Sequence, residues 1–101
     1  MKLVIATCIK EYQEKVQKIF SDAKADVFSA VDITGFKGSN AINLLEEWFA
    51  AGDEKFDSNL IFSFTDEKKA KKILESVKDY NDKNKTRFPI KGFIIPVDDF
   101  A

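Results

Sequence analysis

The chain has 101 residues, 45% of them hydrophobic and ten of them phenylalanine, with sixteen basic and seventeen acidic residues and a net charge of −1. This length and composition fit one folded domain, and the balanced charge argues against a strong nucleic-acid or anionic-membrane footprint. Histidine is absent and Cys8 is the single cysteine, which excludes a triad built on imidazole and an internal disulfide.

The first half of the chain predicts a strand, a helix and a second strand. Residues 2–9, "KLVIATCI", form a nearly unbroken apolar run with β-branched residues, which is typical of a strand. This run is too short for a membrane span and lacks the layout of a signal peptide, so we expect a cytoplasmic protein. Helical spacing begins after Glu11, with an apolar stripe at Tyr12, Val16, Ile19, Phe20 and Ala23. Alternation in "VFSAVDITGF", residues 27–36, predicts the second strand.

The second half repeats this order after a long insert. Residues 59–64, "NLIFSF", predict a third strand, and Thr65 or Asp66 can cap the helix that follows. The polar run "NDKNKTR", residues 81–87, is interpreted as the loop that ends this helix. Residues 88–97 predict the last strand, with a proline near each end, as is usual for proline in strands.

The order strand, helix, strand, insert, strand, helix, strand predicts an α+β fold, the ferredoxin-like plait. This fold has a four-stranded antiparallel sheet with two helices on one face. Several strands are apolar on both sides, whereas an antiparallel sheet with one face in water alternates more clearly. We therefore expect the second face to be buried against other copies of the chain.

The stretch "TGFKG" at the end of the second strand is the first candidate site. Lys37 lies between Gly35 and Gly38, which is a composition found where backbone donors and a lysine meet an anion. The spacing of a phosphate-binding P-loop is absent. A strand exit that needs positive φ angles explains the two glycines equally simply, and the pattern alone favours it.

The insert itself predicts a short extra helix between the second and third strands. Ser39 or Asn40 can cap its start and Gly52 its end. Its apolar face consists of Ile42, Leu44, Leu45, Trp48 and Phe49. This face packs either on its own domain or on a partner, since tryptophan and phenylalanine are common interface anchors.

Other features give weaker signals. Cys8 lies in the middle of a strand with no cationic neighbour, which indicates a buried, inert thiol. Lys83, Lys85, Arg87 and Lys91 gather before the last strand and form a candidate anion site. "KGFII", residues 91–95, faintly matches an RNA-recognition signature, but it lies on the fourth strand instead of the third, so no nucleic acid is expected as a partner.

The segments "MKLVIATCIKEYQEKVQKIF" and "DITGFKG" resemble the nitrogen-regulatory P-II proteins. The first resembles their opening strand and helix, and the second the point where their second strand leaves the sheet into the T-loop. The resemblance implies a single domain over residues 1–101, with a T-loop-like insert at about residues 37–58. It also implies a cytoplasmic homotrimer without enzymatic activity, which senses a small effector in clefts between subunits. Residues 39–59 would pass the signal to a partner, such as a membrane transporter or an enzyme.

Two departures from the P-II pattern affect the expected ligand. Typical P-II proteins bind ATP or ADP with a glycine-rich loop before the last strand and arginines after it. Here "NDKNKTRFP" has no glycine and "FIIPVDDF" has no arginine. We therefore do not expect ordinary ATP or ADP binding, and the resemblance does not specify another effector. The candidate ligand-binding residues are Gly35, Phe36, Lys37 and Gly38, with Arg87 and Lys91 as substitutes. The candidate interface residues are Ile42, Leu45, Trp48 and Phe49.

Two alternatives to this reading stay open. The short tail is closer to the CutA-type relatives, which implies a CutA-like or efflux-associated protein that responds to metal through Cys8 or through carboxylates such as Asp98 and Asp99. An acylphosphatase-like enzyme shares the plait but needs a phosphate-binding arginine, and Arg87 is the only arginine in the chain. We expect a binding protein and not an enzyme.

Overall fold

The computed structural model describes residues 1–36 and 55–101, and it has the predicted order of elements. The first half contains strand β1 (Lys2–Ile9), a 3₁₀ turn η1 (Lys10–Tyr12), helix α1 (Gln13–Asp22) and strand β2 (Ser29–Phe36). The second half contains β3 (Lys55–Thr65), α3 (Glu67–Lys83) and β4 (Lys91–Pro96). The extra helix expected in the insert lies outside the described residues.

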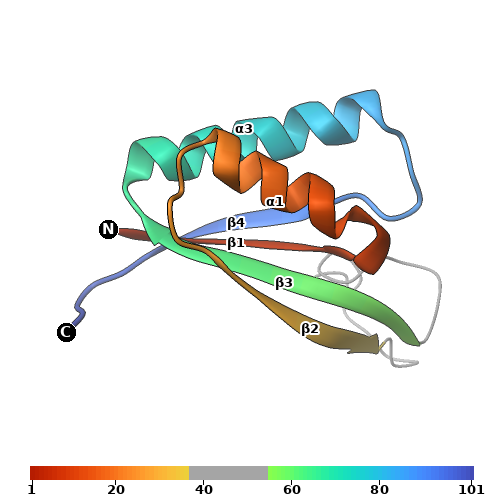
Figure 1. Cartoon of the computed structure of the whole chain (residues 1–101), viewed down its shortest axis with the longest axis horizontal. Coiled ribbons are helices and arrows are strands. Elements are labelled where there is room, and N and C mark those ends of the chain that lie inside the picture. Colours follow the sequence, from red (N-terminus) through yellow and green to blue (C-terminus); the bar gives the residue numbers. More distant parts are fainter. Residues whose placement is uncertain (37–54) are drawn as a thin grey trace.

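The four strands form one antiparallel sheet in the order β2-β3-β1-β4. Both helices lie on the same face of this sheet, as Figure 1 shows. This is the α+β, ferredoxin-like arrangement that the sequence predicted, with β1 and β3 in the centre and with β2 and β4 at the two edges. None of the helices in the described residues is long and apolar enough to cross a membrane.

The core lies between the helices and the sheet. Each helix places the apolar stripe read from the sequence against the strands, and the alternate residues of β1 and β3 meet it. The fully buried side chains include Val16 and Phe20 of α1, Ala70 and Ile73 of α3, and Val4, Ala6 and Ile61 of the sheet. Gly92 allows α3 to approach β4 closely, since a Cβ atom there would lie 2.6 Å from Leu74 Cδ2.

The largest differences from the predicted boundaries are at the end of α3 and at the starts of β3 and β4. Helix α3 starts as expected, with Asp66 Oδ1 accepting a hydrogen bond of 2.8 Å from the backbone N–H of Lys69. It runs through residues 81–83, however, which the sequence placed in a loop, and β4 begins only at Lys91. Strand β3 begins at Lys55 instead of residue 59, because the polar run 55–58 pairs with residues 33–36 of β2. The insert therefore ends at residue 54 rather than residue 58.

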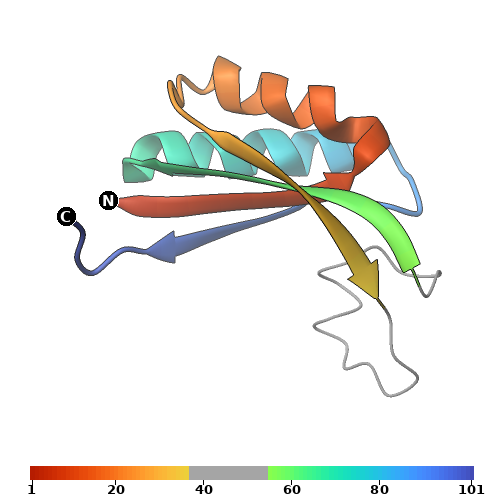
Figure 2. The ribbon, with the colours of Figure 1, turned by 60° about the horizontal axis from the view of Figure 1, so that its bottom comes forward.

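The face of the sheet opposite the helices is apolar as well. Leu3 of β1 lies directly between Phe64 of β3 and Ile95 of β4, and Ile5 lies between Phe62 and Phe93. Residues directly opposite each other in neighbouring strands share a face, so these side chains form one surface, which we call the open face. Its members also include Ile9, Val31, Ile33 and Leu60. Figure 2 shows that both helices lie on the other side of the sheet.

Parts of the open face are in contact with solvent. The exposed fractions are 56% for Phe64, 46% for Val31 and 41% for Ile95. The rings of Phe62 and Phe64 meet edge to face, with centroids 6.3 Å apart. Thr7, Ser58 and Lys91 lie on the same face, and exposed apolar patches of this kind are common at interaction sites.

Candidate functional site

The candidate ligand-binding residues that the structure describes lie on the two edge strands and on one loop. Gly35 and Phe36 end β2, opposite Phe56 and Lys55 of β3. Lys91 starts β4, opposite Thr7 of β1. Arg87 lies in the loop between α3 and β4. The candidates Lys37 and Gly38 lie outside the described residues, as do the interface candidates Ile42, Leu45, Trp48 and Phe49.

A single chain does not bring Gly35 and Lys91 together. Lys91 shares its rung of the sheet with Thr7, Leu60 and Val31, and Gly35 lies four residues beyond Val31 on the far edge. Three strand spacings of ~4.8 Å and four residues of ~3.3 Å each separate the two positions by roughly 20 Å. Any pocket that uses both residues needs the β2 edge of one copy near the β4 edge of another.

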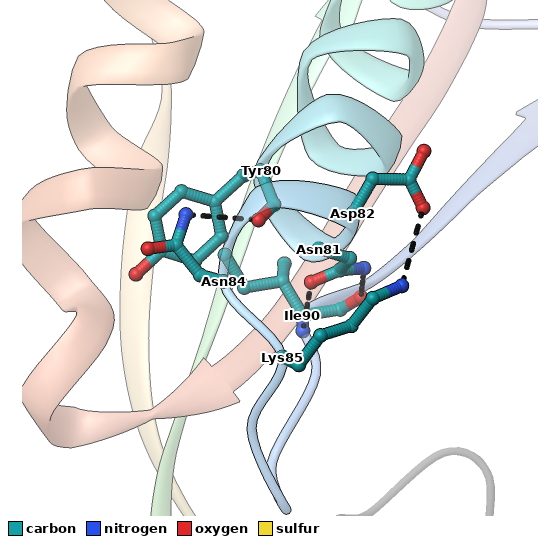
Figure 3. Close-up of polar contacts among 6 residues, drawn as sticks. All are labelled: Tyr80, Asn81, Asp82, Asn84, Lys85 and Ile90. Atoms are coloured by element: carbon teal, nitrogen blue, oxygen red, sulfur yellow. Dashed lines mark hydrogen bonds and ion pairs between the residues drawn. The ribbon is translucent and has the colours of Figure 1, made fainter.

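The loop that carries Arg87 is anchored by a side-chain clamp (Figure 3). Asn81 Nδ2 donates to the carbonyl of Ile90 at 2.8 Å, and Asn81 Oδ1 accepts from the N–H of Ile90 at 3.0 Å. Asn84 closes the end of α3 by donating from Nδ2 to the carbonyl of Tyr80 at 2.9 Å. Together these bonds fix the loop where it leaves α3 and where it enters β4.

The middle of this loop is held by Tyr12, which ends the 3₁₀ turn before α1. Tyr12 Oη donates to Thr86 Oγ1 at 3.2 Å, and Thr86 Oγ1 accepts from the N–H of Phe88 at 2.8 Å. The guanidinium of Arg87 lies 5.8 Å from the centroid of the Phe88 ring, within the range of a cation–π contact. Arg87 is exposed, so this loop presents a positive charge to solvent from an ordered backbone.

A polar contact that sequence reasoning missed lies on the paired strands β2 and β3, four residue pairs before the insert. Asp32 of β2 and Asn59 of β3 are opposite each other, and Asn59 Nδ2 donates to Asp32 Oδ1 at 2.6 Å. Lys10 Nζ lies 3.6 Å from the other carboxylate oxygen of Asp32. Asn59 is only 1% exposed, and its Oδ1 has no hydrogen-bond partner among the residues that the structure describes. The contact ties together the two strands that enter and leave the insert.

The weak metal candidates are placed far apart. Cys8 is buried on β1 opposite Asn59, whereas Asp98 and Asp99 follow the end of β4, where Pro96 lies opposite Lys2. The six residues from Lys2 to Cys8 separate these groups by roughly 20 Å. Within residues 1–36 and 55–101 no three histidine, cysteine, aspartate or glutamate residues gather into a metal-binding group.

The thiol of Cys8 has the character of a core side chain. Burial raises the pKa of Cys8 from 9.0 to about 11, because the thiolate would lose its hydration in the apolar interior. The reactive, metal-binding form of cysteine is the thiolate. The neutral thiol therefore dominates at physiological pH, in agreement with the sequence interpretation of Cys8 as an inert group.

Comparison with known proteins supports the fold. No protein-family model matches the sequence, and no curated protein matches it either. Among solved structures, the chain is similar to a protein from Thermus thermophilus that is described as a PII-like signaling protein. The TM-score is 0.63 over 92% of this chain and 82% of the other, at 12% sequence identity. The P-II-like resemblance read from the sequence thus extends to the three-dimensional fold.

Replacing Asn81 should loosen the loop that carries Arg87. Asn81→Ala leaves the N–H and carbonyl of the buried Ile90 without partners, so we expect a loss of about 1–3 kcal/mol in the free energy of unfolding. Asn84→Ala is the matched control, because it removes one hydrogen bond at an exposed helix end and should cost less. Urea unfolding measures both values, and equal losses would contradict the clamp.

The Cys8 thiol should make stability depend on alkaline pH. The folded state keeps its proton up to about pH 11, whereas the unfolded thiol loses it above about pH 9. The unfolded state thus binds fewer protons in this window, and the free energy of unfolding must fall as pH rises. Lysines and tyrosines titrate in the same range, so the measurement is the difference between the wild type and Cys8→Ala in urea unfolding. A pH-independent difference would show that Cys8 is not desolvated.

Proposed function

We propose that this protein is a P-II-like regulator that works as a homotrimer without enzymatic activity. It binds a small anionic effector in clefts between subunits and passes the bound state to a partner through the segment between β2 and β3. The open face carries this proposal, because its exposed apolar side chains favour burial against a partner, and a trimer of the P-II type would bury them. The place of action would be the cytoplasm, and the partner a membrane transporter or an enzyme.

Support for self-assembly comes from the chemistry of the open face. Ten apolar side chains from all four strands line it in the described residues (Leu3, Ile5, Ile9, Val31, Ile33, Leu60, Phe62, Phe64, Phe93 and Ile95). Burial of apolar surface is worth about 25 cal/mol per Å². Three copies that turn this face inward would remove it from water and leave both helices of each copy outside.

Support for an effector cleft between subunits comes from the separation of the candidate residues. Gly35 ends one edge strand and Lys91 starts the other, and the positive charge of Arg87 stands in the loop before Lys91. A closed assembly brings the β2 edge of one copy to the β4 edge of the next. The cleft then combines a glycine-containing backbone from one subunit with two cations from its neighbour, which is suited to a phosphate or a carboxylate.

The signal would leave the cleft through the strands that carry the insert. Gly35 lies three residues after Asp32, and Asp32 is tied to Asn59 on the returning strand. An effector that contacts Gly35 more favourably in one arrangement of the insert shifts the population toward that arrangement. The partner then reads the insert, and its affinity changes by the same coupling free energy.

A single charge on the open face should separate the subunits. Phe64→Glu would bury a carboxylate at the contact between copies, so we expect a trimer for the wild type and a folded monomer for the variant, measured by multi-angle light scattering. Ser21→Glu is the control, since Ser21 is an exposed residue of α1 on the helix side of the sheet, and it should leave the trimer intact. A monomeric wild-type protein would contradict the proposal.

The effector should reveal itself as a thermal stabiliser. A compound at 100 times its dissociation constant, if it binds only the folded state, adds about 2.7 kcal/mol to stability. The screen covers nucleotides, cyclic dinucleotides, bicarbonate and divalent metals by differential scanning fluorimetry. An effector of the cleft should lose its effect in Arg87→Ala and Lys91→Ala but keep it in Lys15→Ala. A hit that is insensitive to all three variants would place the ligand elsewhere.

A further inference from the structure

A second polar surface lies on the helix side, away from the residues discussed above. Helix α1 ends and helix α3 begins beside a cavity of about 560 Å³. We call it the lysine groove, after the five lysines that line it: Lys24, Lys68, Lys69, Lys71 and Lys72. Two acidic residues and Ala23 complete the lining, so positive charge dominates.

Three of the five lysines make no ion pair within residues 1–36 and 55–101. Lys69 lies 3.9 Å from Asp66, and Lys71 lies 3.5 Å from Glu67. Lys24, Lys68 and Lys72 have no such partner among the described residues. A chain with a net charge of −1 thus concentrates uncompensated positive charge at one place. The acidic residues that balance the net charge of the chain lie mostly outside the lysine groove.

An exposed acidic segment follows β4. This acidic segment consists of Asp98, Asp99 and Phe100. The aromatic side chain of Phe100 is 68% exposed. Its backbone N–H donates to Asp99 Oδ1 at 2.9 Å. Neither aspartate makes an ion pair with the described residues. The segment therefore offers two carboxylates and one apolar anchor.

The groove and the acidic segment lie at the same end of the molecule. Thr65, directly before the cap of α3, is opposite Lys2, and Lys2 is opposite Pro96. The N–H of Val97 also donates to the carbonyl of Met1 at 3.3 Å. Figure 1 shows the chain leaving β4 at the end where α3 begins. Two copies that meet at this end can each offer a segment to the groove of the other, as a two-fold contact requires.

We propose that the lysine groove binds the acidic segment of a second copy of this chain. Asp98 and Asp99 pair with Lys68 and Lys72, and the ring of Phe100 covers the methylene stems of the lysines. The occupant has the charge that the groove lacks, and it carries an apolar side chain that is otherwise left in water. The contact goes beyond the proposed regulatory function and does not depend on it.

A charge swap tests this contact. Lys68→Glu with Lys72→Glu reverses the groove, and Asp98→Lys with Asp99→Lys reverses the segment. Each pair of changes should weaken self-association at low salt by about tenfold, because two exposed ion pairs are lost. All four changes together should restore it. Lys15→Glu with Lys78→Glu carries the same change of charge as the groove variant on residues outside the groove, and it should leave association unchanged. Sedimentation velocity measures all five proteins.

Peptide binding identifies the occupant directly. A labelled peptide of residues 97–101 should bind to the Asp98→Lys, Asp99→Lys chain, whose own segment cannot compete, and should fail to bind when Lys68→Glu and Lys72→Glu are added. The proposal is overturned if the fourfold variant does not recover association. It is also overturned if the segment docks within its own chain, independently of protein concentration.

High salt separates this contact from the trimer. Screening shortens the reach of exposed charges from ~10 Å at 0.1 M to ~3 Å at 1 M salt, so the groove contact should disappear while burial of the open face persists. Phe64→Glu has the opposite signature, since it removes the trimer and leaves the lysine groove and acidic segment intact. Either proposal can therefore fail alone.

Discussion

The sheet of this protein is apolar on both faces, and its two helices cover only one of them. The covered face forms the core around Phe20, Ile61 and Ile73. The other face holds Leu3, Ile5 and Phe62 in its centre and Phe64 at 56% exposure. A surface of this composition gains free energy by leaving water, which favours burial of this face against a partner. The proposed trimer, its clefts and its regulation all depend on this burial.

The same sheet places the candidate ligand residues at its two opposite edges. In an antiparallel plait the strands β2 and β4 form the two edges, and the sheet keeps Gly35 and Lys91 apart. In the proposed assembly, effector binding and self-association would be coupled, because the proposed cleft forms only where two sheet edges meet. Two contacts within the chain hold the elements near these residues: the Asn81 clamp holds the loop of Arg87, and the Asp32–Asn59 contact joins β2 to β3, the strands that flank the insert.

Several features of the fold and site were predictable from residue patterns, and others were not. Helical spacing located α1, and the cap of α3 was narrowed to Thr65 or Asp66, because a capping side chain bonds to backbone only a few residues away; the structure shows that Asp66 is the cap. The sequence placed Asn81 in a loop. Its hydrogen bonds to the backbone of Ile90 could not be predicted, because Ile90 is nine residues away and approaches Asn81 only when the loop after α3 folds back. Asp32 was interpreted as an ordinary strand residue, because its partner Asn59 is 27 residues distant.

By itself the sequence determined the order of elements, the fold class and the presence of two apolar faces, since these follow from local spacing and from the period of each strand. It also indicated an inert Cys8 from its apolar neighbours. Only the tertiary structure decided which residues lie together. It showed that the long β3 pairs with residues 29–36, that Gly35 and Lys91 lie far apart, and that a lysine groove lies between the end of α1 and the start of α3. These depend on register and on helix docking, which are fixed by contacts between residues far apart in the chain.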